Sequence, residues 1–131
     1  TCYEFETGHT VEKIGFVPHP TIEWAGASPD GLIGEDGLCE CKVPNTSTHI
    51  DYLLSNKVPT PYYLQIQFQL ACTERKWCDF VSYDPRLGID LQLLIIRVER
   101  DDAKIEEIEK EVSALLAEVD ETVKKLRELR N

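Results

Sequence analysis

The chain has 131 residues, of which 42% are hydrophobic and 29% are charged, and its formal net charge is −10. This length suits one domain, and the composition is typical of a globular protein rather than of a disordered one. The acidic balance argues against a protein that holds nucleic acid mainly through phosphate contacts, because such proteins are normally basic. It still allows an enzyme in which bound cations and a few local Lys or Arg side chains supply positive potential.

The sequence shows no sign of a membrane or secretory segment. No apolar run approaches the roughly 20 residues that span a bilayer, and no basic stretch followed by an apolar one opens the chain. We therefore expect no membrane partner and a cytoplasmic location. The sequence contains no Met, even at position 1, so we expect a processed chain or a fragment.

The cysteines and histidines do not form an obvious metal site. None of the five cysteines belongs to a CxxC pair, and we expect reduced thiols, with Cys39 and Cys41 buried. An iron–sulfur cluster is the weaker alternative, because it needs four converging cysteines and Cys72 with Cys78 gives only a loose pair. The surface is expected to hold the three histidines, His9, His19 and His49.

The first part of the chain is predicted to be extended and to lead into a hairpin. Residues 1–17 and 20–25 are expected to be extended, and residues 28–31, Ser-Pro-Asp-Gly, are expected to form a turn. A strand is expected at about 38–43. It ends at Pro44, because proline cannot donate to a strand ladder.

Two helices are predicted in the middle of the chain. Residues 46–48 can cap a short helix through Leu54, and Pro61 suits the first turn of a second helix that runs to about Arg75. Apolar spacing in the second helix predicts a core stripe made of Leu64, Phe68, Ala71 and Cys72. A polar stripe, which lines a cleft or is an ordinary solvated face, consists of Tyr62, Gln65 and Gln69.

The last part of the chain is predicted to contain two strands and a long helix. A strand at 79–83 leads to a turn at 84–88, and the apolar, β-branched run at 91–98 is expected to be a central strand. Apolar residues at 3 and 4 spacing over four heptads predict a helix over 101–130. We expect this helix to pack along its own domain, with an intersubunit contact as the alternative.

The most informative local feature is a pair of carboxylates in the predicted hairpin. Side chains alternate along a strand, so Glu40 and Lys42 should share one face while Cys39 and Cys41 share the other. A chain reversal before this strand brings Asp30 beside Glu40. The alternative is a polar hairpin with a solvated face.

These residue types suit a hard divalent cation. Mg²⁺ prefers oxygen ligands and usually takes one or two protein carboxylates plus waters and substrate phosphate. Asp30 and Glu40 meet that requirement, and a main-chain carbonyl can add a third ligand. No His or Cys set has the spacing of a structural zinc site. Lys42 is placed to orient an attacking water and to neutralise charge on a phosphate.

Residues 28–32, Ser-Pro-Asp-Gly-Leu, and 37–42, Gly-Leu-Cys-Glu-Cys-Lys, resemble the active-site signature of the PD-(D/E)xK nuclease superfamily. Within it, the chain is most similar to the phage lambda exonuclease (YqaJ-like) recombination nucleases. The similarity continues through Pro44, 46–47, Tyr62, 65–67, 83–86 and 98–101. It covers essentially the whole chain, which makes it more specific than the triad alone.

The resemblance implies an α/β fold with a restriction-endonuclease-like core, in which a mixed central sheet is flanked by helices and a long C-terminal helix. Residues 1–131 would form a single PD-(D/E)xK nuclease domain without the family's N-terminal helical region. In the family that region carries another active-site carboxylate and an arginine that recognises the 5′ phosphate. The implied ligands of Mg²⁺, or of Mn²⁺ as a substitute, are Asp30, Glu40 and the carbonyl of Cys41. The implied catalytic set is Asp30, Glu40, Lys42, Gln65 and Tyr62, with Lys42 positioning the water.

The resemblance also implies a function. The expected activity is Mg²⁺-dependent 5′–3′ exonucleolytic cleavage of double-stranded DNA, which leaves 3′ overhangs for recombination. The alternative is a non-cutting fragment that binds DNA or partner subunits. Relatives form a ring-shaped trimer around duplex DNA, so we expect a homotrimer and a single-strand annealing protein as a partner, in the cytoplasm of a bacterium or of a phage-infected host.

Overall fold

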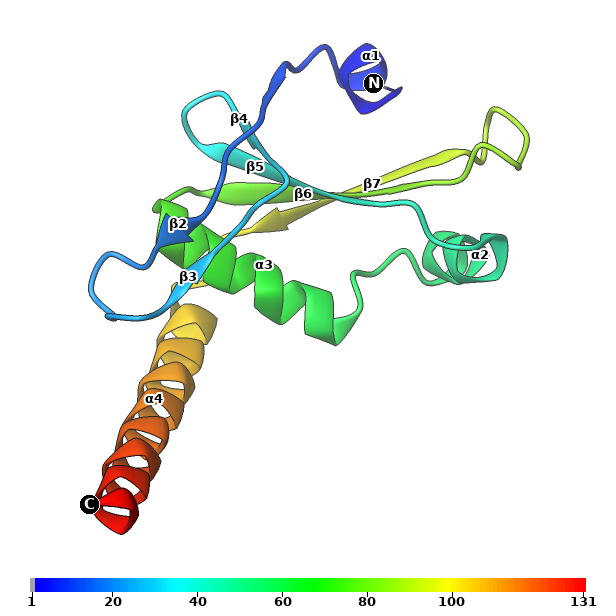
Figure 1. Ribbon diagram of the computed structural model, residues 1–131. Coiled ribbons are helices and arrows are strands. Elements are labelled where there is room, and N and C mark those ends of the chain that lie inside the picture. Colours follow the sequence, from blue (N-terminus) through cyan, green and yellow to red (C-terminus); the bar gives the residue numbers. More distant parts are fainter. Residues whose placement is uncertain (1) are drawn as a thin grey trace.

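The computed structural model describes residues 2–131, and side chains from residue 3 onward. A mixed sheet lies between helices on its two faces, and a long helix extends away from it (Figure 1). The predicted α/β class, with a mixed central sheet and a long C-terminal helix, is therefore confirmed. The elements in chain order are α1 (Cys2–Thr7), β1 (Val11–Glu12), β2 (Val17–Pro18), β3 (Gly26–Ala27), β4 (Gly31–Ile33), β5 (Gly37–Lys42), α2 (Thr46–Ser55), α3 (Thr60–Thr73), β6 (Trp77–Tyr83), β7 (Leu93–Glu99) and α4 (Asp102–Arg130).

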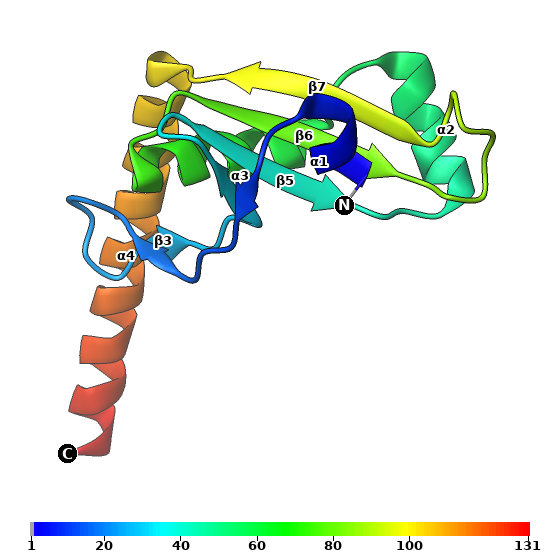
Figure 2. The same cartoon turned by 90° about the horizontal axis from the view of Figure 1, so that it is seen from above.

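The main sheet has the strand order β1-β4-β5-β6-β7, and β2 pairs with β3 in a separate two-stranded sheet. Strands β5 and β6 are parallel, whereas the other pairs are antiparallel. A parallel pair needs a long crossover, which α2 and α3 supply here. Figure 2 shows α2 beside the sheet at the end opposite to α4.

The end of β5 has a neighbouring strand on only one of its two sides, and the candidate site lies at the unpaired side. The ladder between β4 and β5 begins where Gly31 faces Cys39, because β4 starts at Gly31. The ladder between β5 and β6 continues to Lys42, which faces Ser82. The last three residues of β5 therefore have a strand neighbour only in β6.

Each face of the sheet has its own apolar core. The core between the sheet, α3 and the start of α4 contains Leu38, Ile66, Leu70, Ala71, Cys78, Phe80, Val98 and Ile105. The core under α1 contains Tyr3, Ile33, Cys39 and Val81. The sheet alternation therefore sends even-numbered residues of β5 toward α3 and odd-numbered ones toward α1.

The predicted core stripe of the second helix is only partly right. Helix α3 has Pro61 in its first turn and is followed by the capping residue Glu74, whose backbone is left-handed, with φ of 57°. Its buried apolar residues include Ile66 and Leu70, whereas Leu64 is 36% exposed. The helix carries apolar side chains on more than one face, so the spacing alone did not select the face that meets the sheet.

The N-terminal extended segments were predicted only in part, since residues 11–12 and 17–18 form the short strands β1 and β2 but two other stretches are not extended. Residues 2–7 form α1 because Tyr3 is buried against the sheet and its hydroxyl donates to Asp79, 2.7 Å away. Residues 20–25 form turns, and His19 Nδ1 accepts hydrogen bonds from two backbone N–H groups of this segment. Both features depend on partners that local sequence patterns do not show. Thr1 lies outside the described residues.

Two further expectations concern the C-terminal part. Strand β7 forms the edge of the sheet rather than its centre, because no strand of the described sheet lies beyond it. Helix α4 does not pack along its own domain over its full length. Ile105 is buried, but every residue from 117 onward is exposed, and the helix extends into free space (Figure 1). In the described part of the chain, no helix is both long and apolar enough to cross a membrane.

Candidate active site

The predicted arrangement of Glu40 and Lys42 on one face of β5 is confirmed. The Lys42 ammonium lies 3.2 Å from Oε1 of Glu40, which requires both side chains to leave the strand on the same side. The Glu40 side chain is 5% exposed and that of Lys42 is 27% exposed. A nearly buried carboxylate is therefore paired with a lysine that still reaches solvent.

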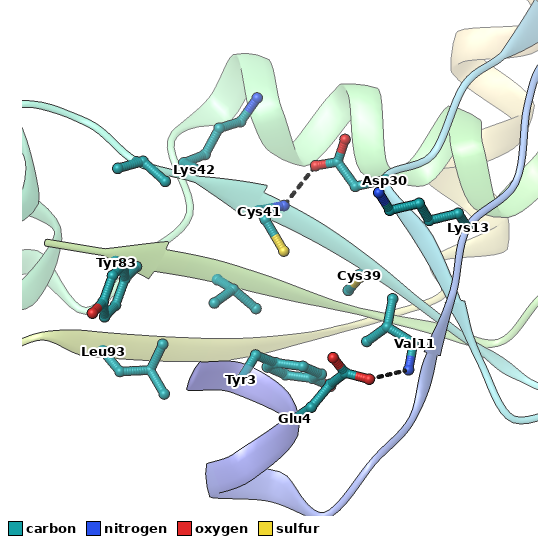
Figure 3. Close-up of a pocket in the computed structure, with 12 residues that line it drawn as sticks. Tyr3, Glu4, Val11, Lys13, Asp30, Cys39, Cys41, Lys42, Tyr83 and Leu93 are labelled. Carbon is teal, nitrogen blue, oxygen red and sulfur yellow. Dashed lines mark hydrogen bonds between the residues drawn. The ribbon is translucent and has the colours of Figure 1, made fainter. Parts of the chain in front are cut away.

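Asp30 lies at the same end of β5, as predicted. It precedes β4, and continuing the register of Gly31 with Cys39 by one residue places Asp30 opposite Glu40. Its Oδ2 accepts a hydrogen bond from the backbone N–H of Cys41 at 2.7 Å (Figure 3). The side chain thus replaces the strand partner that β4 no longer provides.

The main chain of Cys41 supplies a further oxygen at this place. In a strand, the N–H and the C=O of one residue point to the same neighbouring strand. Because the Cys41 N–H points to Asp30, its carbonyl also points to the open side of β5. The thiol of Cys41 points elsewhere, into the space in front of the sheet (Figure 3).

These donors fit a hard divalent cation. The set consists of the carboxylates of Asp30 and Glu40 and the carbonyl of Cys41, all oxygen, with open space for waters and substrate oxygens. Over residues 3–131, no group of three or more His, Cys, Asp and Glu side chains converges to hold a metal. A closed structural zinc site needs four such ligands, so the described residues do not fit one.

The three residues of the predicted polar stripe on α3 differ in how close they lie to Glu40. Gln69 is 1% exposed, and its Nε2 donates to Oε2 of Glu40 at 3.1 Å. Gln65 is exposed to solvent. Tyr62 lies close to the site, since the Lys42 ammonium is 4.5 Å from the centre of its ring. Gln69 belonged to the predicted polar stripe, but only the fold shows that it, and not Gln65, contacts Glu40.

A cavity of about 550 Å³ lies on the opposite face of β5 (Figure 3). Its lining is largely apolar and also includes Lys13, Asp30 and Lys42. The carboxylate of Glu4 also lines the cavity and accepts a hydrogen bond from the backbone N–H of Val11. The cavity thus reaches the open end of β5 from the α1 side of the sheet.

Of the thiols in and near the site, Cys39, Cys72 and Cys78 are buried, whereas Cys41 is exposed. The hydrogen bond between Cys39 and Cys41 raises the pKa of Cys39 far above its usual range and lowers that of Cys41. Burial raises the pKa of Cys78, and it raises that of Cys72 to about 11. Cys41 is exposed, contrary to the prediction that it is buried, because α1 leaves the end of β5 uncovered.

Two of the three histidines are not surface residues as predicted. His49 is fully buried, its Nε2 donates to the carbonyl of Leu91, and its Nδ1 lies 2.7 Å from the Ser82 hydroxyl. His19 is 8% exposed and pairs through Nε2 with Glu109 at the start of α4. Both imidazoles connect elements of the fold, and neither is placed as a base at the carboxylates.

Known proteins resemble this chain in sequence and in fold. Residues 1–76 match the family described as the YqaJ-like viral recombinase domain. The crystal structure of an alkaline exonuclease (LHK-Exo) from Laribacter hongkongensis is similar, with a TM-score of 0.96 and 53% sequence identity, over 97% of this chain and 66% of that chain. The structure of LHK-Exo in complex with dAMP gives a TM-score of 0.95 at 53% identity, over 97% and 65% of the two chains.

A more distant structure shares the fold alone. A phage-related exonuclease from Haemophilus somnus 129PT has a TM-score of 0.76 at 14% identity, over 95% of this chain and 67% of that chain. No curated protein sequence matches the chain. The chain spans 66% of the length of the alkaline exonuclease.

Proposed function

The chain belongs to the YqaJ-like viral recombinase domain family, and from this premise we propose that it is a divalent-metal-dependent exonuclease acting on double-stranded DNA. It degrades the duplex in the 5′–3′ direction and leaves a 3′ overhang for recombination. The observation that carries the proposal is the meeting of Asp30, Glu40 and Lys42 at the open end of β5. The polarity and the recombination product rest on the family resemblance.

The proposed cofactor is Mg²⁺, which Mn²⁺ can replace. Its protein ligands are the carboxylates of Asp30 and Glu40 and the carbonyl of Cys41, which together make up the PD-(D/E)xK type of site. When bound, the ion supplies polarisation of the phosphoryl oxygen and lowers the pKa of a water.

Lys42 orients the attacking water and neutralises charge that grows on the phosphate. Its ammonium is held between Oε1 of Glu40 and the ring of Tyr62, so its reach is limited to one end of the site. Tyr62 limits the movement of Lys42 from the α3 side. Gln65 lies one helical turn beyond Tyr62, on an exposed surface where it can approach the substrate.

Several features of the surrounding molecule support a nucleotide substrate. The cavity next to Asp30 and Lys42 has a volume of about 550 Å³, within the usual range for small-molecule sites, and it carries Lys13 at its edge. The dAMP held by the related alkaline exonuclease is a nucleoside monophosphate, the class of product that hydrolysis of a terminal phosphodiester releases. We propose that this cavity holds the terminal nucleotide of the DNA.

The proposed assembly is a homotrimer around the duplex, with residues 1–131 as one nuclease domain. An acidic protein of net charge −10 gains little from phosphate contacts on its outer surface. A duplex held in a central channel is instead retained by the ring and by local Lys and Arg side chains. A single-strand annealing protein is the proposed partner for the 3′ overhang, in the cytoplasm of a bacterium or phage-infected host.

A labelled-duplex assay tests this function. Linear DNA with a 5′ phosphate is labelled near its 5′ or near its 3′ ends and incubated with the chain in Mg²⁺ or in EDTA. We expect mononucleotides from the 5′ label first, no release in EDTA, and no release by Glu40→Gln. Release in EDTA, or internal cuts without mononucleotides, would overturn the proposal. Duplex binding without any release would instead support the non-cutting alternative.

A further inference from the structure

Gln69 holds one oxygen of the Glu40 carboxylate, and Lys42 holds the other. The amide Nε2 of Gln69 lies 3.1 Å from Oε2, and the ammonium of Lys42 lies 3.2 Å from Oε1. Because a carboxylate only accepts hydrogen bonds, the amide must present its nitrogen to Glu40. The two donors come from different elements, α3 and β5, so the plane of the carboxylate is fixed from two sides.

The other end of the same amide has no partner. Within residues 3–131, Oε1 of Gln69 is one of the buried side-chain oxygens without a hydrogen bond. A buried acceptor that is left unpaired reduces stability, because it loses water and gains nothing in return. An apolar side chain of similar size would avoid this loss in a position that the α3 core surrounds.

Gln67 provides the comparison on the same helix. It is also fully buried, but both ends of its amide are paired. Its Nε2 donates to the carbonyl of Glu99 at 2.9 Å, and its Oε1 accepts from the N–H of Asp101 at 2.9 Å. Gln67 therefore acts within the fold, by joining α3 to the end of β7, whereas Gln69 uses only the end that faces Glu40.

We propose that Gln69 is a positioning residue that fixes the Glu40 carboxylate in the orientation needed to bind the divalent cation, at a loss of folding stability. The inference rests on the proposed metal-dependent function. With a hydrogen bond on one oxygen and an ion pair on the other, Glu40 keeps lone pairs for the cation, and rotation of the carboxylate plane is restricted. Hydrogen-bond partners of metal ligands commonly contribute 10- to 100-fold in metal affinity, on the order of the effect expected here.

The test is Mn²⁺ binding to the chain, followed by calorimetry and by the EPR signal of the free ion, together with melting in EDTA. We expect Gln69→Leu to weaken Mn²⁺ binding by about 10- to 100-fold, and to melt in EDTA at the same temperature as the parent chain or higher. Gln69→Glu, which keeps the shape but replaces the donor by an acceptor, weakens binding at least as much. The matched control Gln67→Leu lowers the melting temperature and leaves Mn²⁺ affinity unchanged.

Two results would overturn the inference. One is unchanged Mn²⁺ affinity in both Gln69 variants, and the other is a loss of affinity that occurs equally in Gln67→Leu and so follows stability alone. The variant Asp30→Asn shows whether a negative result concerns only the role of Gln69 or the proposed metal site as a whole. If Asp30→Asn weakens Mn²⁺ binding and the Gln69 variants do not, the metal site stands and the role of Gln69 is wrong. If none of them alters binding, the metal site itself is wrong.

Discussion

Lys42 is held close to the proposed metal ligands without being one of them. Its ammonium pairs with Oε1 of Glu40 and faces the ring of Tyr62. A protonated lysine repels a cation and cannot coordinate it. In the proposed mechanism it contributes a positive charge and a hydrogen-bond donor next to the phosphate.

This separation of roles gives a prediction at the residue scale. Lys42→Ala should lower turnover by about 10²- to 10⁴-fold, the usual effect of losing a group that assists proton transfer or charge stabilisation. Its Mg²⁺ affinity should be largely retained, because Lys42→Ala removes one partner of Glu40 but also removes a positive charge that repels the cation. Asp30→Ala and Glu40→Ala should lose affinity and turnover together. Metal titration beside single-turnover DNA hydrolysis checks this, and an equal loss of Mg²⁺ affinity in Lys42→Ala would show that the roles are assigned wrongly.

The sequence predicted some of these residues well and others poorly, for a physical reason. The strand period of two fixes the faces of Glu40 and Lys42, and the short hairpin fixes Asp30 beside them. Gln69 could not be chosen over Gln65 in the same way, because α3 is apolar on more than one face and its rotation depends on the sheet. The buried His49 also depends on partners that are distant in sequence.

Among the elements, the turn between β6 and β7 connects the sheet to the loop after the candidate site. Oδ1 of Asp84 accepts from Nε and from the backbone N–H of Arg86, at 2.7 and 3.0 Å. The same guanidinium donates to the carbonyl of Pro44, directly beyond β5. The hydrogen bonds from Arg86 lower the pKa of Asp84 from 3.8 to about 2. Asp84 therefore contributes to stability as a charged group.

The pH dependence of this contribution follows from the direction of the pKa shift of Asp84. A carboxylate with a lowered pKa in the folded state stabilises the fold fully above 3.8, and this stabilisation is lost as the pH falls to about 2. We expect Asp84→Asn to melt at a lower temperature than the parent chain at pH 7, with the difference decreasing over that window. Asp90→Asn, at an exposed position nearby, is the control. A melting difference that stays constant between pH 5 and pH 2 would contradict the role of the Asp84 charge.

Elements that carry a local sequence signal were predicted better than elements that depend on distant contacts. Strand β5 and helices α2 and α3 were expected near their observed places, because proline and apolar spacing mark them. Helix α1 was missed, since it is stabilised by the contact of Tyr3 with Asp79 on β6. Strand β7 was placed at the centre because an apolar run does not distinguish a central strand from an edge strand.

At the scale of the whole molecule, α4 is the part that the fold leaves uncovered. It runs for 29 residues, but of these only Ile105 is buried. Its large apolar side chains further along are exposed, namely Leu115, Val119, Val123, Leu126 and Leu129. They recur at 3 and 4 spacing and lie on one side of the helix, which is the arrangement that packs against another surface.

This arrangement supports the proposed homotrimer and provides a variant that tests it. Analytical ultracentrifugation at low micromolar concentration should show a species of three chains. Val119→Glu, on the apolar side of α4, should shift the distribution toward monomer without changing the melting of the sheet domain. Ala117→Glu adds the same charge on another side of the helix and should leave the trimer intact. A parent chain that is monomeric and still degrades long duplexes without release would contradict the ring.

The central claim, that the open end of β5 holds the catalytic cation, is tested most directly by anomalous diffraction from crystals grown with Mn²⁺. We expect one peak at bonding distance, about 2.0–2.2 Å, from an oxygen of Asp30, an oxygen of Glu40 and the carbonyl of Cys41. The ammonium of Lys42 should lie outside this distance. A peak bound elsewhere, such as at Glu4 on the α1 side of the sheet, with no density at Glu40 at saturating Mn²⁺, would contradict the claim.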